Sequence, residues 1–313
     1  MSSTTPSVPA YRDPSVGDVI IRTSDQVEYH VQQRRLADVS LLFADMFTLP
    51  QPPPADGAAN QKPIVDVSES SALWDKLLPL IHNDSEPRLN TNDFGDLLEA
   101  CRKYQAPGLQ SRFRIHLLHL AHVDENPFRV YAVACFGGFE DAASAAARRT
   151  LRFPNFLADV EEYALVTGRA LYRLSDYRRR CGEAAGAVVT VDSDTSCGYS
   201  TKAKWLIDAN VVSSANPCQC SNTWFYYGEP LERAGFRIRH SWLGYLRDVK
   251  DIVATVPSGD AACSTSLLEP VMKAAEPYKC CANKIGMEAL VFSGQVRAKI
   301  DDAISEVPFV FEP

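Results

Sequence analysis

The sequence predicts an α+β protein, in which a small mixed sheet flanked by helices is followed by an all-α extension and a mainly helical C-terminal region. Two patterns lead to this prediction. Residues 18–31 and 63–67 carry the β-branched or alternating runs of short strands, whereas from Asn90 onward the apolar residues recur at helical spacing. A chain of 313 residues that is 46% apolar is long enough to form two domains.

The first predicted element is a strand hairpin. Residues 18–22 form a β-branched run, Ser24 and Asp25 are turn formers, and the apolar residues of 27–31 alternate with polar ones. After Gln33 the period changes, and the apolar residues of 36–47 fall on one face of a helix. That face must be buried.

A second strand and helix follow. Residues 63–67 read as a strand, and a helix begins near Ser70 or Ser71, where a serine hydroxyl can accept a hydrogen bond from a free amide of the first turn. Its apolar stripe is Leu73, Trp74, Leu77, Leu78 and Ile81.

These residues resemble the BTB/POZ domain, in the form found in fungal BTB proteins. The matching segments are GDV at 17–19, the first helix ending in ADMFTLP at 44–50, a proline-rich insert, IVDVSE at 64–69, and the helix DLLEACRKY at 96–104. The resemblance covers about residues 15–122. It implies a protein-binding fold that self-associates, and in many members it implies an adaptor that brings a target to a cullin ubiquitin ligase.

The chain departs from the family pattern at two places. Gln32 and Gln33 stand where the family usually has a histidine-lysine pair, and Ser40-Leu41 stands where a serine-proline is usual. We expect the fold to survive both changes. The resemblance does not carry over a partner contact that uses the charged pocket near Asp18.

The remaining boundaries follow from composition. Residues 1–14 are polar and small and predict a disordered tail, and the proline-rich residues 50–63 predict a mobile insert within the domain. Helices are expected at 90–122 with a break at Pro107-Gly108, and then at 127–135, 139–151, 157–166 and 170–189. Residues 123–190 are similar to the helical extension of fungal BTB proteins, including CGEAA at 181–185.

The C-terminal region, 191–313, is expected to hold cysteine-containing loops and a terminal helix, without strands. In that helix the residues at 285, 289, 292, 296, 300 and 303 repeat every three to four positions and should dock on the rest of the chain.

Two groups of residues are candidate zinc ligands. The first group is Cys218, Cys220, Cys280 and Cys281, with Cys197 and Cys263 nearby in the sequence. By binding one zinc ion, these thiolates could hold together a segment that shows no obvious core of its own. The gaps of one and zero residues within the pairs do not match familiar zinc motifs, so the favoured interpretation is small apolar side chains and no cofactor. His116, His119 and His122 lie three apart on one helix and are interpreted mainly as helix-surface residues.

An arginine cluster in the last helix of the extension is the third candidate. Its members are Arg169, Arg173, Arg178, Arg179 and Arg180. They could bind a phosphate or an acidic partner, but the alternation with Leu171, Tyr172, Leu174 and Tyr177 favours a solvated helix face.

Charge, motifs and cysteine usage exclude several functions. A net charge of −7 disfavours nucleic acid as a partner. The longest apolar run is too short for a membrane span, the first sixteen residues lack a secretory core, and nine scattered cysteines suit the reducing cytoplasm or nucleus. The common catalytic motifs are missing, so we expect no enzyme. The alternatives are a scaffolding or transcriptional BTB interactor without a cullin, and a zinc module or enzyme in 191–313.

Overall fold

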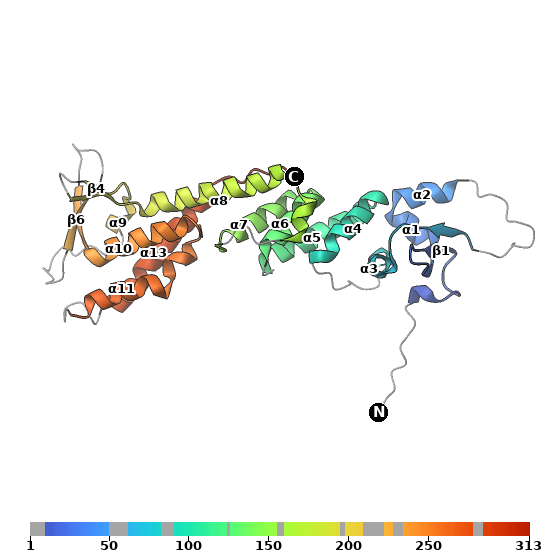
Figure 1. Cartoon of the computed structure of the whole chain (residues 1–313), viewed down its shortest axis with the longest axis horizontal. Coiled ribbons are helices and arrows are strands. Elements are labelled where there is room, and N and C mark those ends of the chain that lie inside the picture. Colours follow the sequence, from blue (N-terminus) through green and yellow to red (C-terminus); the bar gives the residue numbers. More distant parts are fainter. Residues whose placement is uncertain are drawn as a thin grey trace, which may run out of the picture. The chain divides into compact units, whose positions relative to one another are not determined.

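The computed structural model describes residues 10–49, 62–82, 91–123, 126–154, 160–194, 198–208, 222–227, 234–277 and 284–313 (Figure 1). The chain divides into two compact units. The first comprises 1–146 and 160–166, and the second comprises 147–159 and 167–313. The boundaries at 122 and 190 expected from the sequence differ from this division, because the helices of 123–190 are shared between the two units.

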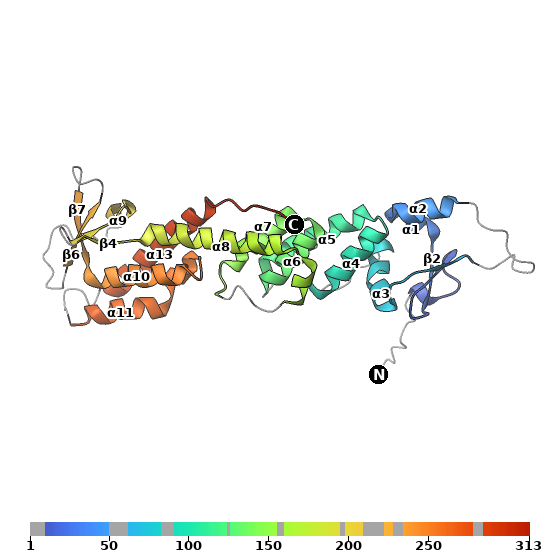
Figure 2. The same cartoon turned by 45° about the horizontal axis from the view of Figure 1, so that its top comes forward.

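The first unit is built on a three-stranded sheet with the order β2-β1-β3 (Figure 2). Strand β1 (Val19–Arg22) is antiparallel to β2 (Glu28–Val31), with Ile20 opposite His30, and parallel to β3 (Ile64–Asp66), with Ile21 opposite Val65. The predicted hairpin and third strand are confirmed. The parallel pairing requires the crossover that the intervening helices provide.

Helices make up the rest of the first unit. They are α1 (Gln33–Val39), α2 (Leu41–Thr48), α3 (Ser71–His82), α4 (Thr91–Lys103), α5 (Pro107–Val123), α6 (Pro127–Gly137) and the 3-10 helix η2 (Glu161–Leu165). Helix α7 (Glu140–Thr150) spans the boundary between the units. Helix α6 packs on α4, α5 and η2.

Three details differ from the predictions for this unit. The first helix is broken at Ser40 into α1 and α2, because Ser40 is extended and its hydroxyl caps α2 by accepting a hydrogen bond from Phe43 N at 3.2 Å. The start of α3 is capped by a carboxylate from the hairpin turn, since Asp25 Oδ1 accepts from Ser71 N at 2.9 Å. Residues 10–12, within the expected disordered tail, form the 3-10 helix η1 (Ala10–Arg12). The insert expected at 50–63 lies outside the described residues up to 61.

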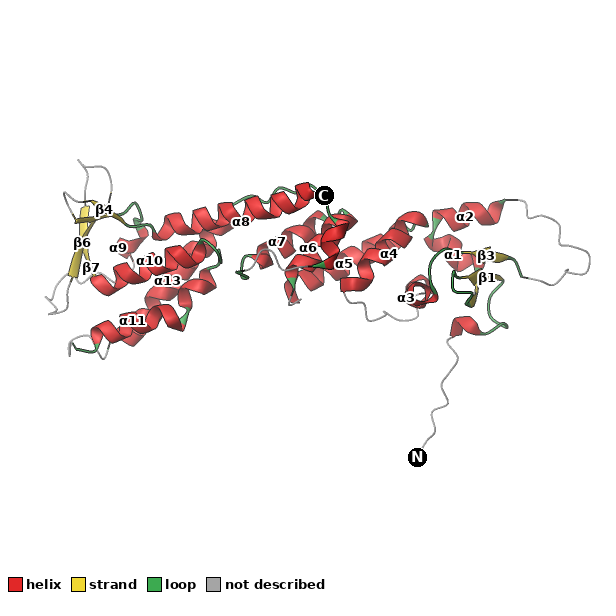
Figure 3. Ribbon diagram, viewed as in Figure 1, coloured by secondary structure: helices red, strands yellow, loops and turns green. Residues whose placement is uncertain are grey.

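The second unit contains a four-stranded sheet that the sequence analysis did not predict (Figure 3). Its order is β4-β5-β6-β7, with β4 (Asp192–Asp194), β5 (Gly198–Ser200), β6 (Asn222–Tyr227) and β7 (Ala234–Arg239). The expectation of a C-terminal region without strands is wrong. Phe225 of β6 and Phe236 and Ile238 of β7 bury one face of this hairpin, but the unbroken aromatic run at 224–227 hides the alternation in the sequence of β6.

Helices pack on this sheet and on one another. They are α8 (Gly168–Val189), α9 (Trp205–Asp208), α10 (His240–Val253), α11 (Thr265–Ala275) and α13 (Ile285–Ser305), with the 3-10 helix η3 (Gly259–Cys263). Helix α8 packs on α10 and α13. A Cβ at Gly182 would meet Val253 O at 3.2 Å, so this glycine lets α8 and α10 approach closely.

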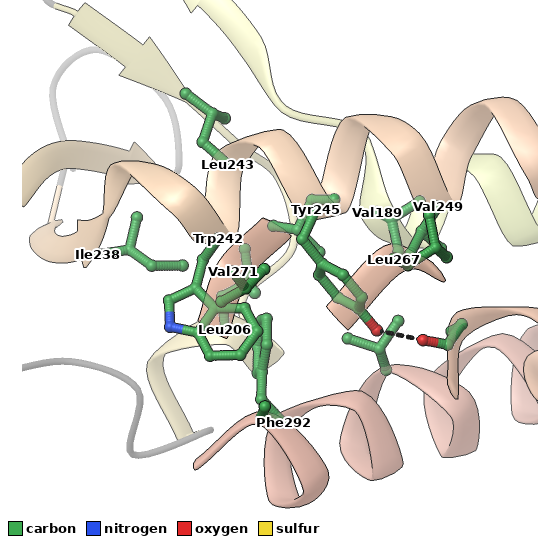
Figure 4. Close-up of a cluster of buried hydrophobic side chains, with 14 of the residues drawn as sticks. Val189, Leu206, Ile238, Trp242, Leu243, Tyr245, Val249, Leu267, Val271 and Phe292 are labelled. Atoms are coloured by element: carbon green, nitrogen blue, oxygen red, sulfur yellow. Dashed lines mark hydrogen bonds between the residues drawn. The ribbon is translucent and has the colours of Figure 1, made fainter. Parts of the chain in front are cut away.

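The core of the second unit combines aromatic rings with aliphatic side chains (Figure 4). The rings of Trp242 and Phe292 lie 4.7 Å apart edge to face, and Tyr245 OH donates a hydrogen bond to Ala262 O at 2.8 Å. The predicted docking face of the terminal helix is confirmed from Ile285 to Ile300, because all five residues of that stripe are buried. The region 191–313 therefore shares a hydrophobic core with α8, whereas the zinc hypothesis assumed that this region has no obvious core.

Within the described ranges, no helix combines the length and the apolarity that a bilayer crossing requires.

Candidate interaction surface

The zinc candidates of the sequence are not brought together in the part of the chain that the structure describes. Cys218, Cys220, Cys280 and Cys281 lie outside the described residues, as does Cys197. Elsewhere in the described ranges, no three histidine, cysteine, aspartate or glutamate side chains form a group that could hold a metal ion. His116 instead lies 5.5 Å from the ring of Phe94, and His119 and His122 are exposed.

The arginine cluster is used within the second unit. Arg169 and Arg173 both donate to the carboxylate of Glu312, which lowers the pKa of Glu312 to about 2. Arg179 and Arg180 both pair with Asp176. Because these guanidinium groups are already paired with carboxylates, little of the cluster is left to bind a phosphate.

Arg178 contradicts the interpretation of the cluster as a solvated face. Its side chain is 7% exposed and donates to the carbonyl oxygens of Thr150, Phe153 and Thr255. It therefore ties the end of α7 and the end of α10 to α8. A buried arginine of this kind is structural.

Three buried cysteines are poor nucleophiles. Burial raises the pKa of Cys101 to about 12 and those of Cys135 and Cys181 to about 11. Since the thiolate is the reactive form, these thiols are almost wholly protonated at neutral pH.

Helix α2 carries an apolar face that the described residues of its unit leave partly exposed. Leu42 and Met46 lie four residues apart on one side of the helix, and Leu49, the C-cap residue, follows three positions later at the end of that side. Leu42 is 39% exposed, Leu49 is 62% exposed and Met46 is half-buried. We call these three residues the α2 stripe.

The neighbouring side of α2 is fixed to the core. The ring of Phe43 stacks 5.0 Å from that of Tyr104 and lies edge-on to Trp74 at 6.4 Å. At the start of the helix, Ser40 Oγ donates to Tyr104 O, and Leu41 N donates to Gln105 O at 3.1 Å. The α2 stripe is therefore presented on a helix whose position is held by both side-chain packing and backbone contacts.

A groove lies beside α3 and α4. It is lined by Ser68, Glu69, Ser70, Leu73, Asp96, Glu99, Ala100 and Lys103. The exposed carboxylates of Asp96 and Glu99 have no ion-pair partner among the described residues, and Leu73 contributes an apolar wall. Its chemistry suits a partner segment that carries both basic and apolar side chains.

One end of this groove is held by the lysine-tyrosine pair that ends α4. Lys103 Nζ donates to Glu69 Oε1 at 2.6 Å, and the hydroxyl of Tyr104 donates to Glu69 Oε2. Burial disfavours the ionised form of Glu69, but these hydrogen bonds outweigh it and keep the pKa of Glu69 below its usual value. Sequence reasoning noted the pair but missed its partner, which lies 34 positions earlier along the chain.

Asp18 has a local structural role. Its Oδ1 accepts a hydrogen bond from Gln33 N at 2.7 Å, so the carboxylate caps the first turn of α1.

Comparisons with known proteins give no family for this chain. No family model matches it. No curated protein matches it either.

Proposed function

We propose that this chain is a non-catalytic protein-interaction protein built on a BTB/POZ domain at residues 15–122. It associates with a second copy of itself, and it brings a target protein to a cullin ubiquitin ligase. The sequence resemblance over 15–122 is the source of this proposal. A three-stranded sheet in which β1 lies between β2 and β3, with helices between and after the strands, is compatible with it.

The observation that carries the proposal is the α2 stripe. Apolar side chains that are exposed on a rigid helix lose little conformational entropy on binding, so they favour contact with a partner protein. Leu42 and Leu49 are the most exposed of the three and lie two turns apart. We assign to this face the contact with the cullin.

The groove beside α3 and α4 supports a second protein contact. Its two unpaired carboxylates lie on one helical turn of α4, at Asp96 and Glu99. Charges at the rim of an interface chiefly set partner choice and association rate. A basic target segment is the occupant that this charge favours.

The test is affinity purification of the intact chain from its native cells, followed by mass spectrometry of the proteins that co-purify. The variant Leu42→Glu with Leu49→Glu places two carboxylates on the α2 stripe. The control is Ile115→Glu, which puts the same charge on a residue of the first unit that is 69% exposed but lies on α5. We expect the cullin to be recovered with the wild-type chain and the control, and to be lost with the double variant.

Other outcomes separate the alternatives. Reproducible partners without a cullin would replace the adaptor by a scaffolding or transcriptional BTB interactor. A cullin that is retained by the double variant would contradict the assignment to the α2 stripe. About one equivalent of zinc in protein purified without chelator would instead favour the metal-binding module in 191–313.

A further inference from the structure

The terminal helix α13 has a second apolar face, which the described residues of its own unit leave exposed. Met287, Leu290 and Val291 lie at spacings of three and one residues and are 70%, 66% and 53% exposed. At 100° per residue, Gly294 and the exposed Ala298 continue the same side of the helix. We call these five residues the α13 stripe.

This stripe lies on the opposite side from the face that docks in the core. The buried stripe runs from Ile285 through Phe292 to Ile300 and is fully used inside the second unit. A helix with apolar residues on two opposite sides typically packs against a neighbour on each of them. Exposed apolar residues that are contiguous in this way mark interaction sites more often than single ones do.

Gly294 is the second observation. It lies inside the helix, where glycine is unfavourable compared with alanine, and a Cβ added there would meet open space. Packing within the chain therefore does not require the glycine. A second backbone that approaches α13 closely at this point would require it.

The charged residues at the two ends of the stripe indicate which helix supplies this second backbone. The stripe begins next to Lys284 and ends next to Asp302, both of which are exposed and have no ion-pair partner among the described residues. If another copy of α13 lies antiparallel across the stripe, Lys284 of each copy meets Asp302 of the other, with Gly294 close to the centre. A parallel arrangement would place like charges together.

We propose that the α13 stripe is a self-association surface, on which two copies of this chain pack α13 against α13 in an antiparallel pair related by a two-fold axis. The site is separate from any association through the BTB-like unit, because all the residues involved belong to the second unit. Residues of a two-fold interface must be self-complementary, and this stripe meets that condition in both shape and charge.

The first experiment measures the mass of the full chain by light scattering over a wide concentration range. The variant Gly294→Leu should fold at least as well as the wild type, because leucine favours helix and finds open space, yet it should block close approach of the helices. We expect the mass of the wild type to fall by half in this variant, while its thermal midpoint stays equal or rises. The control Ile115→Glu should retain the wild-type mass.

The second experiment reverses the charges. Lys284→Asp and Asp302→Lys should each weaken association, and the two together should restore it. The two positions are 18 residues apart on one helix, about 27 Å at 1.5 Å per residue, so they cannot pair within a chain. Rescue by the double variant would therefore report an antiparallel contact between copies.

Three results would overturn the proposal. They are a wild-type mass of one chain at every concentration, a mass that Gly294→Leu leaves unchanged, and a double charge reversal that associates no better than the single ones. Association through the first unit would survive every α13 variant, so the failure of this proposal is distinguishable from the failure of the proposed function.

Discussion

Replacing Arg178 by methionine should destabilise the second unit much more than the same replacement at the next residue. Arg178 is buried and donates to three carbonyl oxygens, whereas the side chain of Arg179 is 58% exposed and pairs with Asp176 and Glu183. Methionine keeps most of the volume of either side chain and removes its hydrogen bonds. The two variants therefore make the same chemical change at a buried and at an exposed position of one helix, so the difference between them reports the effect of burial.

The magnitude follows from the contacts. A hydrogen bond from a charged donor contributes about 1.5–3 kcal/mol, and we count two at Arg178 because the third, to Thr255 O, is long at 3.3 Å. The gross loss of about 3–6 kcal/mol is offset in part, since the variant no longer buries a guanidinium. The expected net cost is about 2–4 kcal/mol. At Arg179 the exposed ion pairs predict about 0–1 kcal/mol.

Urea unfolding followed by far-ultraviolet circular dichroism measures this difference. With a urea dependence of about 2 kcal/mol per molar, the expected cost lowers the midpoint of the affected transition by about 1–2 M. The midpoint of Arg178→Lys should lie between those of the wild type and Arg178→Met. Lysine keeps the positive charge, but it lacks the planar guanidinium that donates to several carbonyl oxygens at once. If the methionine variants of Arg178 and Arg179 have midpoints within about 0.3 M of each other, the argument from burial is refuted.

Three further predictions concern single side chains. Hydrogen bonds from Ser71 and Thr23 lower the pKa of Asp25 to about 2, below its unfolded value, so the stabilisation is complete above about pH 4 and is lost as the pH falls toward 2. Asp25→Ala should therefore reduce the melting temperature at pH 7 but leave it equal to that of the wild type at pH 2; an equal loss at both values would contradict the capping role. Ser40→Ala should cost about 1–2 kcal/mol in urea unfolding, because it removes the α2 cap, and a change below about 0.3 kcal/mol would show that the cap is dispensable. In native protein at pH 8, a maleimide should modify Cys263, which is half-buried, well before Cys181, as peptide mass spectrometry would reveal; equal rates would argue against the burial of Cys181.

Elements with a local periodic signal could be predicted from the sequence. The hairpin at 19–31, the helix from Ser71 and the buried stripe of α13 appear close to where their patterns place them. Strands β6 and β7 were missed because WFYY at 224–227 is an unbroken aromatic run, and in β7 only Phe236 and Ile238 alternate with polar residues.

Other features depend on contacts that no local pattern contains. Asp25 caps a helix 46 residues later, and Glu69 accepts hydrogen bonds from the end of α4. The burial of Arg178 could have been inferred, because it shares a helix face with Leu174 and Cys181, at spacings of four and three residues. All five arginines lie in one helix, and their positions around its axis distinguish the buried Arg178 from the other four.

The division of the chain has a consequence for dissecting it. The chain passes between its two units three times, after residues 146, 159 and 166. A fragment that stops at 146 loses Glu162, the buried ion-pair partner of Arg129 in the first unit. A fragment that extends to 166 keeps that pair but removes the carbonyl oxygens of Thr150 and Phe153 from Arg178. No single cut leaves both units complete, so fragments of this protein made by one cut will fold poorly even where a fragment contains most of one core.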